Sequence, residues 1–166
     1  MTYSEWETAV PDAIKKDIVW KMEAYRLSLF LGDLAWHDAS KIMRDKRTQG
    51  LTTQFYPAVG SISANIAEGY SRTSTKDQAR FFEYALGSAR ESRDWYFKCR
   101  FILGESIFEH RLKLLTSIMR LLLATIPRQR SQNSNLHEPP AEYAGNSPPS
   151  EEDSFQLEEV APLPDV

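Results

Sequence analysis

Apolar residues recur at alternating intervals of four and three along residues 108–126, and this spacing constrains the fold more than any other feature of the chain. The series consists of Phe108, Leu112, Leu115, Met119, Leu122 and Ile126. In an α-helix this spacing places every member on one stripe, whereas a half-buried strand would need strict alternation. Because no window of the chain shows a sustained period of two between turn residues, the sequence predicts an all-α protein.

The helical pattern divides residues 1–130 into four expected helices, at about 13–41, 51–71, 75–103 and 107–127. Ser74 with Asp77 is typical of a helix start, Gly104 of a helix end, and Pro127 of a stop. Short connections of about 3–10 residues favour antiparallel neighbours. We therefore expect one domain, an antiparallel up-down-up-down four-helix bundle, with an irregular helical array as the alternative.

Residues 131–166 differ sharply from this body in composition. They contain eight of the 23 acidic residues, six of the nine prolines and no Lys or Arg. Such a segment cannot bury enough apolar surface to offset the entropy lost on ordering, so we expect a disordered C-terminal tail. The tail either serves only to keep the protein soluble or folds back on the body and competes with phosphate.

All 20 Lys and Arg lie within residues 1–130, against the remaining 15 acids, so the body has a net charge of +5. A basic surface is the minimum requirement for binding phosphate without reading base sequence. The bundle topology predicts two basic ends connected along the third helix, and these supply the candidate nucleic-acid-binding residues Lys41, Arg44, Lys46, Arg47, Arg72, Lys76, Arg80, Arg90, Arg93, Arg111 and Lys113. The alternative is an ordinary solvated helix exterior.

Two segments, residues 61–74 and 84–91, are crowded with Gly, Ala and Ser, which predicts two helices whose backbones approach closely. The expected small-residue face of the second helix consists of Gly60, Ala64, Ala67 and Ser71. Asn65 and Glu68 are three residues apart and Arg72 lies four further on, so the three can share a face. They form either a polar binding cluster or a structural one. The candidate packing or interface residues are Asn65, Glu68, Gly69, Gly87 and Ser88.

The sequence predicts no catalytic residue, no metal site and no cofactor, so we expect a protein that is not an enzyme. Its three histidines lack companions at metal-ligand spacing, Glu68 lacks a second titratable group, and no Gly-rich phosphate loop occurs. The single cysteine, Cys99, falls on an apolar stripe and is expected in the core. With no apolar run near the roughly 20 residues of a membrane span and no disulfide partner, a cytoplasmic location is expected.

The chain also resembles a known family, through Val19-Trp20-Lys21, Gly50-Leu51-Thr52, Asn65-Ile66-Ala67-Glu68-Gly69 with Arg72, and Ala85, Gly87-Ser88 and Glu91. It resembles the four-helix-bundle family that includes proteins encoded in intervening sequences of bacterial large ribosomal RNA genes and the accessory variability proteins of diversity-generating retroelements. The resemblance covers about residues 18–127.

The resemblance implies a ring, typically a pentamer, with a positively charged surface. In the retroelement members that ring is similar to a scaffold that binds template RNA and a reverse transcriptase. This chain departs from the family in reading Gln54-Phe55-Tyr56-Pro57 where a basic pair usually follows the glutamine, and in carrying an acidic tail.

Together these features predict a non-enzymatic, homo-oligomeric helical protein that binds structured RNA or an RNA–protein complex, with a reverse-transcriptase accessory scaffold as one form of that role. The alternative is a protein–protein adaptor or structural oligomer without a nucleic-acid role. The salt dependence of binding distinguishes the two functions, because binding through phosphate contacts weakens steeply as the salt concentration rises, whereas binding to a protein partner need not.

Overall fold

The computed structural model describes residues 1–131 and 160–164, excluding the side chains of residues 128–131. Within these residues the chain is all-α, as predicted. The α-helices are α1 Tyr3–Ala9, α2 Asp12–Lys15, α3 Glu23–Ile42, α4 Thr52–Tyr70, α5 Thr75–Leu103 and α6 Glu105–Ser131, with short 3-10 helices at Ile18–Lys21 and Gln49–Leu51. Most of the predicted tail lies outside the described residues.

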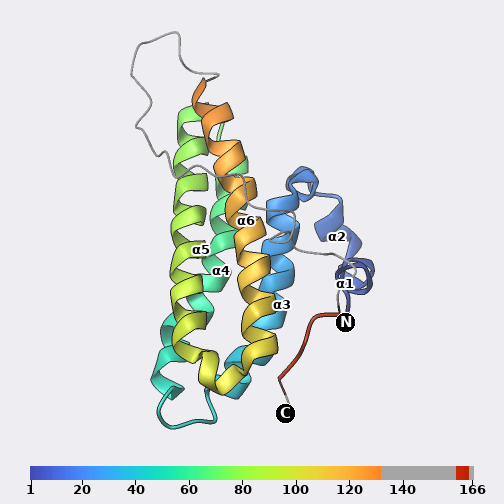
Figure 1. Cartoon of the computed structure of the whole chain (residues 1–166). Helices are drawn as coiled ribbons and strands as arrows, with labels where there is room; N and C mark the ends of the chain where they lie inside the picture. Colours follow the sequence, from blue (N-terminus) through green and yellow to red (C-terminus); the bar gives the residue numbers. More distant parts are fainter. Residues whose placement is uncertain (132–159, 165–166) are drawn as a thin grey trace.

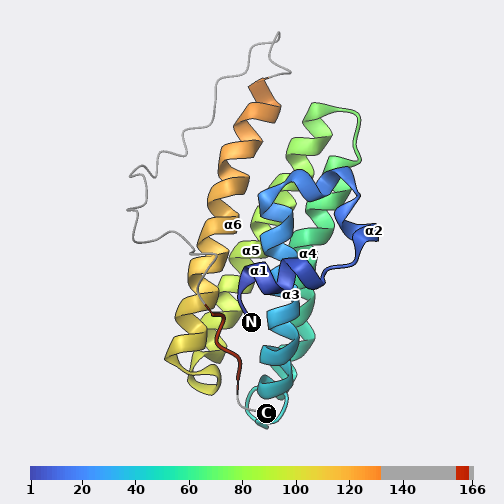
Figure 2. The same ribbon diagram turned by 90° about the vertical axis from the view of Figure 1, so that its right-hand side faces the viewer.

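The four long helices, α3 to α6, lie side by side, and α1 and α2 cover one side of them (Figures 1 and 2). The loop between α3 and α4 lies at the same end of the molecule as the turn between α5 and α6, and the α4–α5 connection lies at the opposite end. This placement determines which basic residues can share a surface.

Helices α5 and α6 begin and end largely where the sequence predicts. The Ser74 hydroxyl accepts a hydrogen bond from the Asp77 amide at 3.4 Å, and Gly104 ends α5 with a φ of 90°, a conformation that favours glycine. The predicted stop at Pro127 is wrong, because α6 continues to Ser131. A proline this close to a helix end lacks only one intrahelical hydrogen-bond donor.

The single helix predicted over residues 13–41 is also wrong. The Asp17 side chain accepts a hydrogen bond from the Val19 amide at 3.1 Å and starts a 3-10 turn, and Met22 is extended before α3 begins. The sequence analysis also missed α1. That helix starts with a capping box in which the Glu5 amide donates to Thr2 Oγ1 at 3.2 Å and the Thr2 amide donates to Glu5 Oε2 at 2.7 Å.

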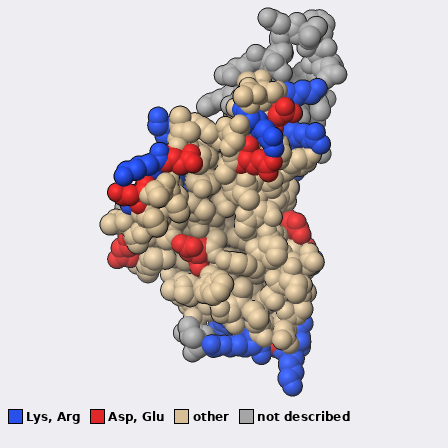
Figure 3. Space-filling view, turned by 180° about the vertical axis from the view of Figure 1, so that it is seen from behind, with Lys and Arg blue, Asp and Glu red and all other residues tan. Residues whose placement is uncertain are grey.

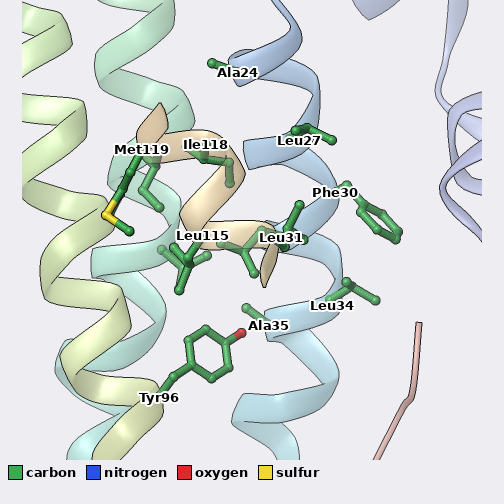
Figure 4. Packing of buried hydrophobic residues seen from close by; sticks show 14 of the residues in the cluster. Ala24, Leu27, Phe30, Leu31, Leu34, Ala35, Tyr96, Leu115, Ile118 and Met119 are labelled. Atoms are coloured by element: carbon green, nitrogen blue, oxygen red, sulfur yellow. The ribbon is translucent and has the colours of Figure 1, made fainter. Parts of the chain in front are cut away.

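The core lies between the long helices, with α1 packed on its edge. Figure 4 shows part of it, where Leu31 of α3, Tyr96 of α5 and Leu115 of α6 point toward one another. The predicted apolar stripe of α6 is buried except for Leu112, which is half-buried. On the edge, the Trp6 indole donates a hydrogen bond to Asp33 Oδ2 at 2.6 Å and so holds α1 on α3.

One short piece of the predicted tail packs against the body. Residues Val160–Pro164 lie next to the N-terminus (Figures 1 and 2), and Ala161 is buried to 2% exposure. The prediction of disorder over the whole of 131–166 is therefore wrong for this segment, because it buries apolar surface and makes hydrogen bonds with Met1 and with Arg111 of α6.

Candidate nucleic-acid interface

The first group of predicted cations lies at the end of the molecule that holds the α3–α4 loop. Lys41 lies in the last turn of α3, and Arg44, Lys46 and Arg47 are exposed in the loop that follows. Arg47 forms an ion pair with Asp45, with Nη2 2.5 Å from Oδ2, and this contact lowers the pKa of the Asp45 carboxyl to about 2. Within the described part of the chain the other three cations have no ion-pair partner, so this end carries an excess of positive charge.

A second group lies at the opposite end, around the α4–α5 connection. Arg72, Lys76 and Arg80 are all exposed. Arg72 forms an ion pair with Glu68, and Arg80 Nε donates a hydrogen bond to the Tyr84 hydroxyl at 2.6 Å. Each end therefore has one predicted cation in an ion pair, which leaves Lys76 and Arg80 without one here, against three such cations at the α3–α4 end, among the described residues.

Between the two ends, exposed cations follow α5. Arg90 and Arg93 line a shallow depression together with Phe97, and Lys113 is exposed on α6. Further along α5, the Arg100 guanidinium lies over the rings of Phe97 and Phe101, at 3.8 and 4.1 Å from their centroids. Interleaved cations and exposed rings are typical of surfaces that bind phosphate and stack bases.

The sequence analysis did not identify Phe97 and Phe101 as surface aromatics, although both are exposed. The signal was available, because Phe97 and Phe101 are four apart and fall off the stripe of α5 that enters the core. Phe101 is 81% exposed, which is unusual for a side chain of this size.

The prediction that Arg111 belongs to a basic surface is wrong. Arg111 has 0% exposure, and its guanidinium contacts the equally buried Asp38 carboxylate, with Nε 2.8 Å from Oδ2 and Nη2 3.1 Å from Oδ1. The Tyr96 hydroxyl donates to Asp38 Oδ2 at 2.9 Å. A buried charge needs a charged partner and several hydrogen bonds, and Asp38 on α3 supplies both.

The buried pair also affects the protonation of two neighbouring groups, His110 and Tyr96. Arg111 Nη1 lies 3.0 Å from His110 Nδ1, and because arginine can only donate, Nδ1 accepts. Burial, with Arg111 and Lys113 nearby, lowers the pKa of His110 to about 4, so the imidazole is neutral at pH 7. Burial and the adjacent Asp38 raise the pKa of Tyr96 well above its usual value, so its hydroxyl stays protonated and donates.

The small and polar residues of the predicted motif divide between the core and the surface. Gly69 is buried, and a Cβ there would lie 2.9 Å from Phe81 Cβ and 3.0 Å from Phe82 Cε1, so α4 and α5 do approach closely at this point. Asn65 Nδ2 donates to the Ser61 carbonyl at 2.8 Å and lies 3.5 Å from Ser88 Oγ. A Cβ at Gly87, by contrast, would meet nothing within 4 Å.

The outer face of α4 is exposed, and over residues 52–67 it carries no charge. The expectation that its small residues pack on the next helix is wrong for Gly60, Ala64 and Ser71, which face solvent. Residues 52–67 contain no ionisable acid or base of the Asp, Glu, Lys or Arg type. Tyr56 on this face makes an edge contact, 6.0 Å between centroids, with Trp36 of α3, which is 62% exposed.

Figure 3 shows the side on which α4 lies. Lys and Arg gather toward the two ends of this view, and a broad region between them carries few charges. On this side of the molecule, charged residues therefore concentrate toward the ends and the middle carries few.

Other kinds of site are not indicated by the part of the chain that the structure describes. It contains no group of three or more His, Cys, Asp and Glu placed to hold a metal ion. Cys99 is buried, and burial raises the pKa of its thiol to about 11, which keeps it in the unreactive thiol form. None of the described helices is both long and apolar enough to cross a membrane.

A comparison with protein families identifies one that covers most of the helical body. The family model of the 23S rRNA-intervening sequence protein matches residues 20–124. No curated protein and no solved structure matches the chain. The matched range begins just before α3 and ends within α6, so it includes α3, α4, α5 and most of α6, and leaves out α1, α2 and the segment Val160–Pro164.

Proposed function

Because the chain belongs to the family of 23S rRNA-intervening sequence proteins, we propose that it is a non-enzymatic, homo-oligomeric helical protein that binds structured RNA or an RNA–protein complex through its cationic ends. The proposal includes the finer arrangement of α3 to α6 as an antiparallel up-down-up-down bundle, assembly into a ring of about five copies, and a cytoplasmic location. A reverse transcriptase is one RNA–protein partner that the family resemblance suggests.

The observation that carries the proposal is the contrast between the charged ends of the molecule and the uncharged stretch of α4 over residues 52–67. A ring joins two different faces of each copy, and the buried centre of such an interface is poor in charged residues, so a face without charge is well suited to self-association. The cations are then left at the ends, where a phosphate backbone can reach them.

Electrostatics supports the α3–α4 end as the stronger phosphate site. Lys41, Arg44 and Lys46 are close in sequence and form no ion pair among the described residues, while Arg47 is paired with Asp45. The ring surface formed by Phe97 and Phe101 lies on α5 near the same end and offers unpaired bases a place to stack.

The experiment is the salt dependence of binding to a fluorescent RNA hairpin, measured by anisotropy between about 50 and 200 mM salt. We expect the logarithm of affinity to fall linearly with the logarithm of salt concentration. Arg44→Glu with Lys46→Glu should reduce the magnitude of this slope by about 1.4–1.8, since each phosphate contact contributes roughly 0.7–0.9. The matched control, Lys16→Glu with Lys21→Glu, changes two exposed cations near the N-terminus and should leave the slope unchanged.

Self-association is tested separately by light scattering coupled to size-exclusion chromatography. Ala64→Arg places a charge in the uncharged α4 face, and we expect it to yield smaller species. The control Ala13→Arg introduces the same side chain at an exposed position of α2 and should not alter the mass.

The alternative function, a protein–protein adaptor, draws on the same uncharged face and on the exposed Trp36–Tyr56 pair. The two functions separate in the RNA experiment. Absence of binding at low salt by an oligomer of normal mass would refute the RNA role and leave the adaptor.

A further inference from the structure

The segment Val160–Pro164 contacts the body in a regular pattern. Ala161 and Pro164 are buried, while Val160 and Leu163 are exposed, Val160 to 63%. Burial therefore repeats every three residues. A polyproline II helix has three residues per turn, and prolines at two of five positions favour that conformation. The pattern indicates a polyproline II turn with one edge against the protein.

The hydrogen bonds of the segment match the needs of such a turn. A polyproline II helix has no internal hydrogen bonds, so each buried backbone group needs an outside partner. The Ala161 amide donates to the Met1 carbonyl at 3.1 Å, and the Pro162 carbonyl accepts from Arg111 Nη2 at 2.8 Å. Proline has no amide hydrogen, so Pro164 is buried without an unsatisfied donor.

Arg111 has a second role at this point. Its guanidinium is held by Asp38 from inside the core, and Nη2 also reaches the segment, so a fixed charged donor lies in the surface that the segment covers. A donor that carries a charge and cannot rotate away is well suited to bind a peptide carbonyl. Ala161 belongs to the buried hydrophobic core, so the segment is anchored by apolar burial as well as by this donor.

We propose that the surface covered by Val160–Pro164 is a recognition site for a polyproline II peptide, and that its ligand is this C-terminal segment of the chain itself. The site selects a small residue at the position of Ala161 and proline at the position of Pro164, and it anchors the backbone carbonyl of the residue after Ala161. The segment binds as a separable ligand: when it is displaced, the site accepts the same sequence supplied as a free peptide.

The test uses the full chain and a fluorescein-labelled peptide of residues 157–166. Ala161→Arg in the protein puts a long charged side chain where 2% of the alanine is exposed, and so displaces the segment. We expect the peptide to bind this variant at least about tenfold more tightly than the wild type, where the tethered segment competes at an effective concentration on the order of millimolar. Val160→Arg, the matched control at an exposed position, should behave as the wild type.

Specificity is tested in the peptide itself. A peptide with Ala161→Arg should lose binding, and one with Val160→Arg should retain it. Equal affinity for the wild type and the Ala161→Arg protein would overturn the proposal, as would the absence of binding by the folded variant at peptide concentrations of about 1 mM. Circular dichroism establishes whether the variant is folded.

If Ala161→Arg prevents folding, amide hydrogen exchange in the wild type tests whether the segment is separable from the body. A separable segment opens without unfolding the body, so the Ala161 amide should exchange at least about a hundredfold faster than the amide of buried Ile118 in α6. Equal protection of the two amides would make the segment an integral part of the core and would overturn the proposal.

Discussion

The buried Asp38–Arg111 pair leads to a quantitative prediction about stability. Asp38→Ala leaves the Arg111 guanidinium in the core without its counter-charge, and removes the acceptor of three hydrogen bonds, two from Arg111 and one from the Tyr96 hydroxyl. Both partners have 0% exposure, so water does not compensate. Removing one partner of a buried pair costs about 3–5 kcal/mol, a large part of the roughly 5–15 kcal/mol that stabilises a typical domain.

A double-mutant cycle separates the charge from the packing. Arg111→Met should cost a similar amount, because it leaves the Asp38 carboxylate buried with only the Tyr96 hydroxyl. The double variant carries no buried charge, so it should cost less than the sum of the two single variants by at least about 2 kcal/mol. Tyr96→Phe, which removes one hydrogen bond to a charged acceptor, should cost about 1.5–3 kcal/mol.

The assay is urea unfolding of the full chain followed by circular dichroism, with the free energy of unfolding extrapolated to water. A loss below about 1 kcal/mol for Asp38→Ala would refute the reasoning, because it would mean that solvent reaches the pair. Additive losses in the cycle would also refute it, since the two side chains would then act independently.

Three further predictions follow from buried groups. Gly69→Ala should lower the free energy of unfolding by about 1–3 kcal/mol, because its Cβ would lie 2.9 Å from Phe81 Cβ, whereas Gly87→Ala in open space should raise it by up to about 1 kcal/mol; urea unfolding compares the two. The lowered pKa of His110, about 4 against 6.5, means that the unfolded chain binds the proton more readily, so stability should fall by up to about 3 kcal/mol as the pH drops from 6.5 to 4. Urea unfolding across this range should show that His110→Gln flattens the fall and that the exposed His37→Gln does not. The Cys99 thiol, with its pKa raised to about 11, should react with a thiol reagent at pH 8 only after denaturant is added, and rapid labelling of the native protein would contradict its burial.

Local features of the sequence were enough to predict the all-α class and most of α5 and α6. Ser74 and Gly104 start and end α5 through contacts and backbone conformation within a few residues of themselves. An apolar spacing of four and three likewise indicates a helix without reference to any other part of the chain. The breaks between α2 and α3 were harder to predict. They depend on short side-chain contacts such as that of Asp17, and on the packing of α1 against α3 through Trp6 and Asp33.

The direction in which a charged side chain points depends on tertiary structure. Arg111 and Lys113 are two residues apart on the same helix and look alike in sequence, yet Lys113 is exposed and Arg111 is buried. The difference comes from Asp38, 73 residues away, which provides a counter-charge only after α3 and α6 have packed together. The docking of Val160–Pro164 depends on the same event, because its partners are Met1 and Arg111, which come together only in the folded chain. Local patterns therefore specify the helices, while long-range packing decides which cations are exposed on the surface and which, like Arg111, are buried and paired in the core.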